Sequence, residues 1–257
     1  MMNDPPPTSE EISVADSRIQ SPICDVVQSD FLFVGDAHPC PYLPGRQATE
    51  EVFIAFELSS ELYHDLMDCG FRRSGDLFYR PICENCRECR AIRVPISDFH
   101  TSKSQRRVLR KNHDVTVTMK EPDFTEEKFR IFRDYSEFQH NSDPEESPER
   151  FRDHLYVSPV KTVEFEYRIA GVLVAVSIAD VCSRSLSSVY AYYDPRFSGR
   201  SIGTFSALWE ILFCRARGIP HYYIGFYIRD CPSMSYKERF RPYEILSPGH
   251  EWIRRSS

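Results

Sequence analysis

The alternation of hydrophobic and polar positions near the end of the chain predicts a strand, a turn, a helix and a second strand. Residues 188–193 are β-branched and aromatic side chains followed by an Asp-Pro pair, which is typical of the end of a strand. From Ile202 to Phe213 apolar residues recur every three or four positions, which predicts a helix that Gly218 ends. Residues 221–227 are a second aromatic strand. This order predicts a βαβ unit.

The turn between the first strand and the helix contains Arg196, Gly199, Arg200 and Gly203. Backbone amides at the start of a helix attract anions, and flanking arginines add positive charge that suits phosphate. The turn is similar to the acyl-carrier loop of acetyltransferase-like (GNAT) folds. In the alternative interpretation, the glycines serve only the turn and its close packing.

The rest of the chain alternates further strands and helices. We expect strands at residues 52–57, 77–80, 92–96, 115–119, 161–167 and 172–180, and helices at 60–69, 102–112, 125–140 and 148–156. Residues 1–28 are rich in proline, serine and acids and are expected to form a disordered or weakly ordered tail. The alternation predicts an α/β or α+β sheet domain.

Composition and charge narrow the class of protein. No apolar run could cross a bilayer, and the first residues do not resemble a signal peptide, so we expect a cytoplasmic protein without a membrane partner. The net charge of -6 argues against nucleic acid as a partner. However, residues 87–111 contain eight basic residues against Glu88 and Asp98, which predicts a local patch for phosphates or an ordinary solvated helix face.

Three cysteines with interlocking C-x-x-C spacing predict a metal site. Cys83, Cys86 and Cys89 lie in one short loop, and Cys40 is the candidate for a fourth ligand, with His38 as the substitute. Such turns place sulfur atoms for tetrahedral coordination, so zinc or an iron-sulfur cluster is possible. Unligated thiols and a redox pair remain open as alternatives.

Six stretches of the chain form an ordered set of motifs: CPYLPGR (40–46), FRRSG (71–75), YRPICENCRECRAIRVP (79–95), SQRR (104–107), YYDPRFSGRSIGTFSALWEI (192–211) and YYIGFYIRDCPSMSYKERFRPYE (222–244). In this order they resemble the aminoacyl-tRNA protein transferases, the arginyl-tRNA protein transferase family, and in particular its bacterial aspartate/glutamate leucyltransferases. The resemblance covers about residues 31–246, nearly the whole chain.

The resemblance implies an architecture and an activity. It implies an N-terminal cysteine-bearing region, at 29–100, followed by a GNAT-like transferase domain at 101–257. It implies transfer of an aminoacyl group from aminoacyl-tRNA to the α-amine of proteins that begin with Asp or Glu, which marks them for degradation by the N-end rule. The family cysteines correspond to Cys40, Cys83, Cys86 and Cys89, although eukaryotic relatives have a C-x-x-C where this chain has a single cysteine at Cys40.

The residues agree with this chemistry. An aminoacyl ester is already activated, and the chain has neither a Walker-type loop nor a serine nucleophile motif, so we expect direct attack by the amine. The candidate catalytic residues are Tyr192, Asp194, Tyr236 and Lys237, each of which alone would more often be a packing or surface residue. We expect the turn described above, with Arg106 and Arg107, to bind tRNA; these two arginines could instead recognise the acidic first residue of the acceptor.

The donor and the class of function each have alternatives. Aromatic residues around the expected site outnumber acids, which favours a leucyl donor over an arginyl one, since a buried guanidinium needs acidic partners. An acyl-CoA N-acyltransferase of the GNAT type and a non-catalytic zinc-containing RNA-binding module are the other hypotheses.

Overall fold

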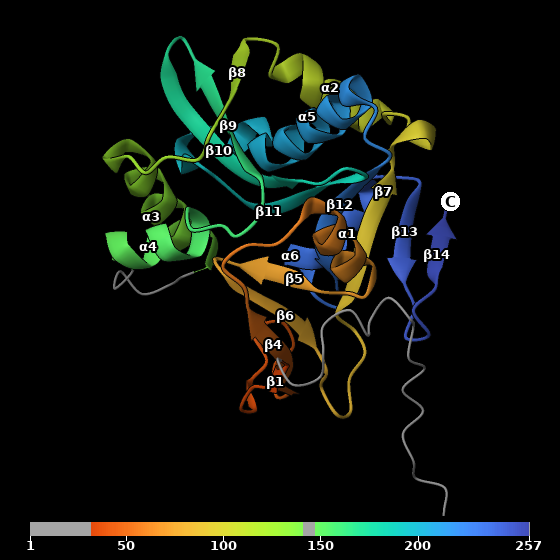
Figure 1. The fold of residues 1–257 in the computed structure, drawn as a ribbon. Helices are drawn as coiled ribbons and strands as arrows, with labels where there is room; N and C mark the ends of the chain where they lie inside the picture. Colours follow the sequence, from red (N-terminus) through yellow and green to blue (C-terminus); the bar gives the residue numbers. More distant parts are fainter. Residues whose placement is uncertain (1–31, 141–146, 257) are drawn as a thin grey trace, which may run out of the picture.

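The computed structural model describes residues 32–140 and 147–256, so the expected tail at 1–28 lies outside the described residues. Its main element is an eight-stranded sheet in the order β14-β13-β7-β12-β11-β10-β9-β8 (Figure 1). The strands are β7 (Arg90–Pro95), β8 (Val115–Lys120), β9 (Thr162–Ile169), β10 (Val172–Val181), β11 (Ser185–Tyr193), β12 (His221–Tyr227), β13 (Tyr243–Leu246) and β14 (Trp252–Arg255). The α/β character expected from the sequence is confirmed.

A smaller four-stranded sheet, in the order β1-β4-β6-β5, precedes the large one in the chain. It contains β1 (Phe33–Val34), β4 (Glu50–Ile54), β5 (Arg72–Ser74) and β6 (Leu77–Pro81), while β2 (His38–Pro39) and β3 (Gln47–Ala48) form a separate pair. Helix α1 (Ser60–Asp68) begins after Ser59, whose side chain accepts a hydrogen bond from the backbone of Leu62, as a helix cap does. Tyr63 of α1, Phe78 of β6 and Tyr223 of β12 share one hydrophobic core, which joins the two sheets.

Helices cover both faces of the large sheet (Figure 1). The elements are η3 (Ile96–Asp98), α2 (Lys103–Lys111), α3 (Glu126–His140), α4 (Pro148–Leu155), η4 (Pro195–Arg200), α5 (Ile202–Arg217), α6 (Pro232–Ser235) and η5 (Tyr236–Arg239). Phe205 and Leu208 of α5 belong to one core with Leu186 of β11. Phe132 of α3 and Phe151 of α4 belong to another, which buries the opposite face of the central strands.

The predicted βαβ unit is present, with a feature that the sequence did not indicate. Helix α5 ends at Gly218, whose φ of 68° suits glycine, and β12 spans the expected residues. Strands β11 and β12 are parallel, but their pairing covers only Ser185–Ser187 with His221–Tyr223. Beyond these residues β11 continues beside β10 and β12 beside β7, so the two strands separate.

The first region of the chain contributes a strand to the large sheet. Strand β7 lies between β12 and β13, although the expected boundary at residue 100 assigns it to the N-terminal region. Within the described residues no helix has the length and apolar character needed to cross a membrane.

Candidate active site

Two basic side chains donate hydrogen bonds to backbone carbonyl groups of β11 and β12, beyond the residues at which these two strands pair. The guanidinium of Arg72, on β5, donates a 2.6 Å hydrogen bond to the carbonyl oxygen of Ser188 on β11. Lys237, on η5, donates a 2.8 Å hydrogen bond from Nζ to the carbonyl oxygen of Phe226 on β12. The region beyond the parallel pair is therefore a buried polar site between the two strands.

Lys237 is held in an environment that disfavours its charge. Its side chain is almost fully buried, with Nζ 3.1 Å from Met234 Sδ. A Cβ atom at position 225 would lie 3.3 Å from Nζ, so Gly225, with a φ of 101°, makes room for the amine. Burial, and secondly the charge of Arg72, lower the pKa of Lys237 to about 7. An amine with this pKa can accept a proton near neutral pH.

A buried carboxyl group lies in the core beside this site. Glu210 of α5 accepts a 2.5 Å hydrogen bond from the hydroxyl of Tyr222, and burial raises the pKa of Glu210 to about 7. Tyr236 packs against the same core, and burial, followed by the charge of Glu210, raises the pKa of its hydroxyl. Tyr236 and Lys237, predicted from the sequence as a pair, both face the interior.

The other two catalytic candidates lie in different surroundings. Tyr192 is buried under α3 and α4, and its hydroxyl is 3.1 Å from that of Tyr156. Asp194 caps η4 and accepts hydrogen bonds from the backbone and side chain of Arg196, at 2.9 and 3.0 Å. Burial raises the pKa of Asp194, but the bonds from Arg196 outweigh it, and the net shift is downward. This geometry favours a packing role for Tyr192 and a capping role for Asp194.

The basic helix and the turn before α5 lie together. Lys111 Nζ, at the end of α2, donates to the carbonyl of Gly199, and the side chain of Asn112 donates to that of Arg200 at 3.0 Å. Arg106 and Arg107 are exposed on α2. Gly203 lies at the start of α5, where a Cβ atom would be 3.8 Å from the ring of Tyr193 and would fit. Close packing therefore does not require this glycine.

The four predicted cysteine ligands surround one cavity of about 210 Å³, together with Tyr42, Tyr79 and Phe226. Burial, followed by the neighbouring thiols, raises the pKa of the Cys89 thiol to about 12. Thiolate ligands of zinc lie about 2.3 Å from the metal. In the described part of the chain, however, no three cysteine sulfur atoms lie within 4.8 Å of one another. The donor chemistry fits a metal, whereas the present spacing is wider than a closed site.

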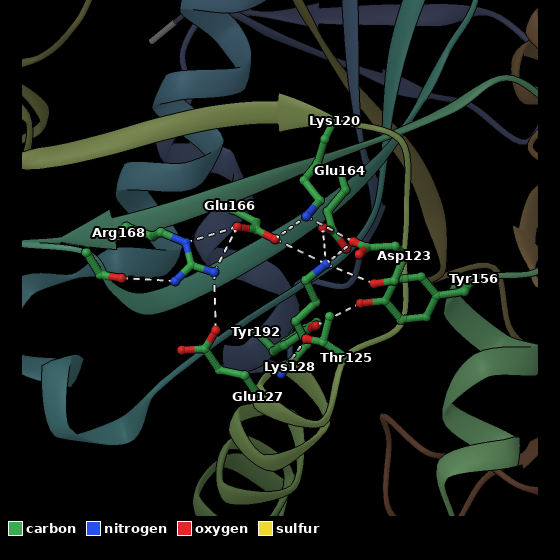
Figure 2. A network of polar contacts seen from close by, with 11 residues as sticks. Lys120, Asp123, Thr125, Glu127, Lys128, Tyr156, Glu164, Glu166, Arg168 and Tyr192 are labelled. Carbon is green, nitrogen blue, oxygen red and sulfur yellow. Dashed lines mark hydrogen bonds and ion pairs between the residues drawn. The ribbon is translucent and has the colours of Figure 1, made fainter.

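A second group of possible metal ligands already contains a cation. Oxygen atoms of Asp123, Glu164 and Glu166 lie within 4.8 Å of one another. Figure 2 shows the ammonium group of Lys128 among them, and Lys128 forms ion pairs with all three carboxylates, at 2.5 Å to Glu164 and 3.2 Å to Glu166. Lys120 adds a 2.7 Å ion pair to Glu166. The cluster is therefore a partly buried salt-bridge network, in which lysine takes the place of a metal.

Arg72 is the site residue that sequence reasoning missed. It stands in the FRRSG stretch, where two consecutive arginines lie on β5, a strand that we did not predict. Two arginines on adjacent strand positions must point to opposite faces, so at least one of them needs a buried partner. That signal was present, but it did not indicate which strand Arg72 would reach.

Comparisons with known proteins agree with a transferase. Profiles of the families described as "Arginine-tRNA-protein transferase, N terminus" and "Arginine-tRNA-protein transferase, C terminus" match residues 38–107 and 127–247. Proteins named aspartate/glutamate leucyltransferase from Pseudomonas aeruginosa (strain LESB58) and Pseudomonas putida (strain W619) are each 39% identical, covering 84% of this chain and 93% of the relative.

Solved structures with a partly similar fold include FemX, with a TM-score of 0.45 and 9% identity over 69% of this chain and 64% of that chain. Another is the C-terminal domain of a putative lysylphosphatidylglycerol synthetase from Agrobacterium fabrum, with a TM-score of 0.44 and 13% identity over 74% of this chain and 57% of that chain.

The family profiles and the named relatives show that the protein is an aminoacyltransferase. The chain belongs to the arginine-tRNA-protein transferase family.

Proposed function

We propose that this protein transfers a leucyl group from Leu-tRNA to the α-amine of proteins that begin with Asp or Glu, and so creates an N-end rule degradation signal in the cytoplasm. The observation that carries the proposal is the match, over 84% of this chain and 93% of the relative, to proteins named aspartate/glutamate leucyltransferase.

We further propose that residues 101–257, together with β7, form a GNAT-like acyltransferase domain, and that residues 29–100 form the cysteine-bearing region. The separation of β11 from β12 after three residue pairs supports this fold, because it opens two strands beside the turn that precedes α5. An acyl donor held by that turn would reach the separated strand ends.

In the proposed reaction the acceptor's uncharged α-amine attacks the carbonyl carbon of the aminoacyl ester. The tetrahedral intermediate collapses with cleavage of the ester C–O bond, and the 3′-terminal ribose oxygen of the tRNA leaves and takes up a proton. Lys237 is suited to accept the proton that the attacking nitrogen loses, because its lowered pKa of about 7 leaves much of it uncharged at neutral pH. Tyr236 is the neighbouring hydroxyl that could stabilise the oxyanion.

The tRNA would lie over α2 and the η4 turn. Arg106 and Arg107 are exposed and, within the described residues, form no ion pair. The hydrogen bonds from Lys111 to Gly199 and from Asn112 to Arg200 join this helix to the turn, so one continuous surface can follow a phosphate backbone. Arg196 is also exposed, but its charge is paired with Asp194.

We propose Cys40, Cys83, Cys86 and Cys89 as ligands of zinc or an iron-sulfur cluster. Their common cavity and four thiol donors support this assignment. Binding would draw the sulfur atoms together and brace the loop that precedes β7, so the expected role of the metal is to stabilise this region.

Purified protein, charged tRNA and synthetic peptides test the proposed function directly. Leu-tRNA and Arg-tRNA should be compared on peptides that start with Asp, Glu or Ala, with the products identified by mass spectrometry. Leucine on the Asp and Glu peptides is the expected result. Arginine transfer would contradict the donor, tRNA-independent transfer from acyl-CoA would contradict the class, and tRNA binding without transfer would indicate an RNA-binding module.

A further inference from the structure

Arg72 is a buried cation without an acidic partner among the residues that the structure describes. Its side chain is only 6% exposed. Apart from the bond to the Ser188 carbonyl, its guanidinium approaches only the sulfur of Met67 among the described residues, at 3.7 Å, and thioether sulfur is a weak acceptor. A guanidinium has five donors and keeps its charge in proteins, so most of its hydrogen-bonding capacity remains available.

Acidic groups near β5 are engaged elsewhere. Arg73, the next residue, forms a buried ion pair with Asp180, with a 2.7 Å bond from Nε. Arg80 pairs with Glu51, and Glu50 accepts from His38 at 2.9 Å. Buried charges are normally paired, because removing an unpaired ion from water is costly. Arg72 therefore lacks a counter-ion that its neighbours all have.

We propose that Arg72 binds the side-chain carboxylate of the acceptor's N-terminal Asp or Glu, with the α-amine of the same residue facing Lys237. This inference rests on the proposed function, and it assigns the selection of acidic acceptors to Arg72 instead of Arg106 or Arg107. A carboxylate suits this position because it is small and can take two parallel hydrogen bonds from one guanidinium. The bulkier phosphates of tRNA suit the exposed arginines of α2.

The positions of the two side chains support this assignment. Arg72 bonds β11 at Ser188, one residue beyond the last residue that pairs with β12, and Lys237 bonds β12 at Phe226. They thus approach the separated strands from two different elements. The charge of Arg72 contributes to the lowered pKa of Lys237, whereas Cys231 acts in the opposite direction. A carboxylate on Arg72 would offset its charge, so the pKa of Lys237 should rise when an acidic acceptor is bound.

Equilibrium binding of peptides tests the inference without requiring transfer. Wild-type protein should bind a peptide that starts with Asp about 100-fold more tightly than its Asn counterpart, since loss of one partner of a buried charge pair has an effect of this order. Arg72→Met should abolish this preference. The control Arg184→Met removes an exposed arginine that pairs with Asp65 and should keep the wild-type preference. If no leucyl transfer occurs, the binding preference still reports on Arg72.

Two further results would contradict the inference. A folded Arg72→Met protein that retains the preference for Asp would exclude this role of Arg72. An unchanged Asp preference together with weaker Leu-tRNA binding would show that its anion is a tRNA phosphate. If Arg72→Met does not fold, Arg72→Lys provides the test: it should reduce the preference about tenfold because lysine cannot form the bidentate pair, and an unreduced preference would overturn the proposal.

Discussion

The guanidinium of Arg200 donates hydrogen bonds to both carboxylate oxygens of Asp114, at 2.8 Å to Oδ1 and 2.9 Å to Oδ2. The two residues are 86 positions apart in the chain. Their ion pair fixes the η4 turn to the loop after α2, so two stretches that the sequence suggested as separate phosphate sites form one surface. It also neutralises the charge of Arg200, which makes this residue a support for the turn more than a free cation.

Arg200 is paired with Asp114, whereas Arg106 and Arg107 form no ion pair within the described residues. Replacing these three arginines should therefore have unequal effects on tRNA binding. Arg106→Ala and Arg107→Ala should each weaken binding about three- to tenfold and lower the salt dependence by about one released counter-ion. Arg200→Ala should have a smaller effect on the salt dependence, because Asp114 already balances its charge. Filter binding at several salt concentrations measures both quantities. Equal slopes for all three variants and the wild type would contradict this assignment of the tRNA surface.

Lys237→Met should lower the rate of transfer by at least about 100-fold, the usual contribution of a positioned acid or base. In the wild type, kcat/KM for the acceptor peptide should rise with pH through about 7, the lowered pKa of Lys237. The acceptor amine titrates near pH 8 and should give a separate step that remains in the variant. If the pH profile of kcat/KM of Lys237→Met still shows the step near pH 7, Lys237 is not the proton acceptor.

The same lysine predicts a pH dependence of stability. Its pKa is 10.5 without perturbation and about 7 in the fold, so between these values the unfolded chain binds more protons. The free energy of unfolding should therefore rise with pH from about 7 towards 10.5. Chemical denaturation of the wild type and Lys237→Met across this range measures the effect. The variant should lack most of the rise, and identical slopes would mean that other groups cause it.

Lys128 balances the charge of three carboxylates, two of them buried, so replacing it should strongly destabilise the fold. Lys128→Met should destabilise the protein by about 3–5 kcal/mol, the usual cost of breaking a buried pair from one side. Glu164 is fully buried against this lysine, so Glu164→Gln in the Lys128→Met background should recover part of the loss. Thermal and urea unfolding measure both the loss of stability and its partial recovery. The exposed pair of Arg254 and Asp98 offers a control, for which Arg254→Met should cost about 1 kcal/mol or less.

Metal analysis tests the cysteine site. Protein purified without oxygen should contain about one equivalent of zinc or an iron-sulfur chromophore per chain, and Cys83→Ser or Cys86→Ser should lose it and unfold more easily. Cys214→Ser is a suitable control, because Cys214 lies in the core under α5, away from the cysteine cavity. Active protein with neither metal nor cluster would refute the site.

Local sequence was enough to predict α5 and β12: α5 repeats its apolar positions every three or four residues, β12 is rich in aromatic residues, and Gly218 and Pro220 separate the two elements. The capping box of α2, in which Ser102 and Gln105 bond each other's backbones, likewise follows from local sequence. Strands β13 and β14 were not predicted, since they are short and their positions depend on pairing, of β13 with β7 and of β14 with β13.

The candidate site was predictable only in part, for a similar reason. Lys237 was singled out by its motif, but the separation of β11 from β12 is a property of pairing between distant strands. The partners of Asp194 and Arg72 likewise depend on three-dimensional neighbours. Arg196, the partner of Asp194, is only two residues away in the chain, so this local turn contact could have been recognised from the sequence. The other, Ser188, lies 116 residues from Arg72.

The position of β7 means that the family's two sequence regions do not correspond to two separable folding units. The N-terminal profile includes this strand, yet its hydrogen bonds hold β13 and β14 to the remainder of the large sheet. A fragment that began at residue 101 would leave β12 with an open edge and detach the last two strands. A truncated form of this protein therefore has to include β7, and the cysteine loop just before it, to keep the large sheet whole.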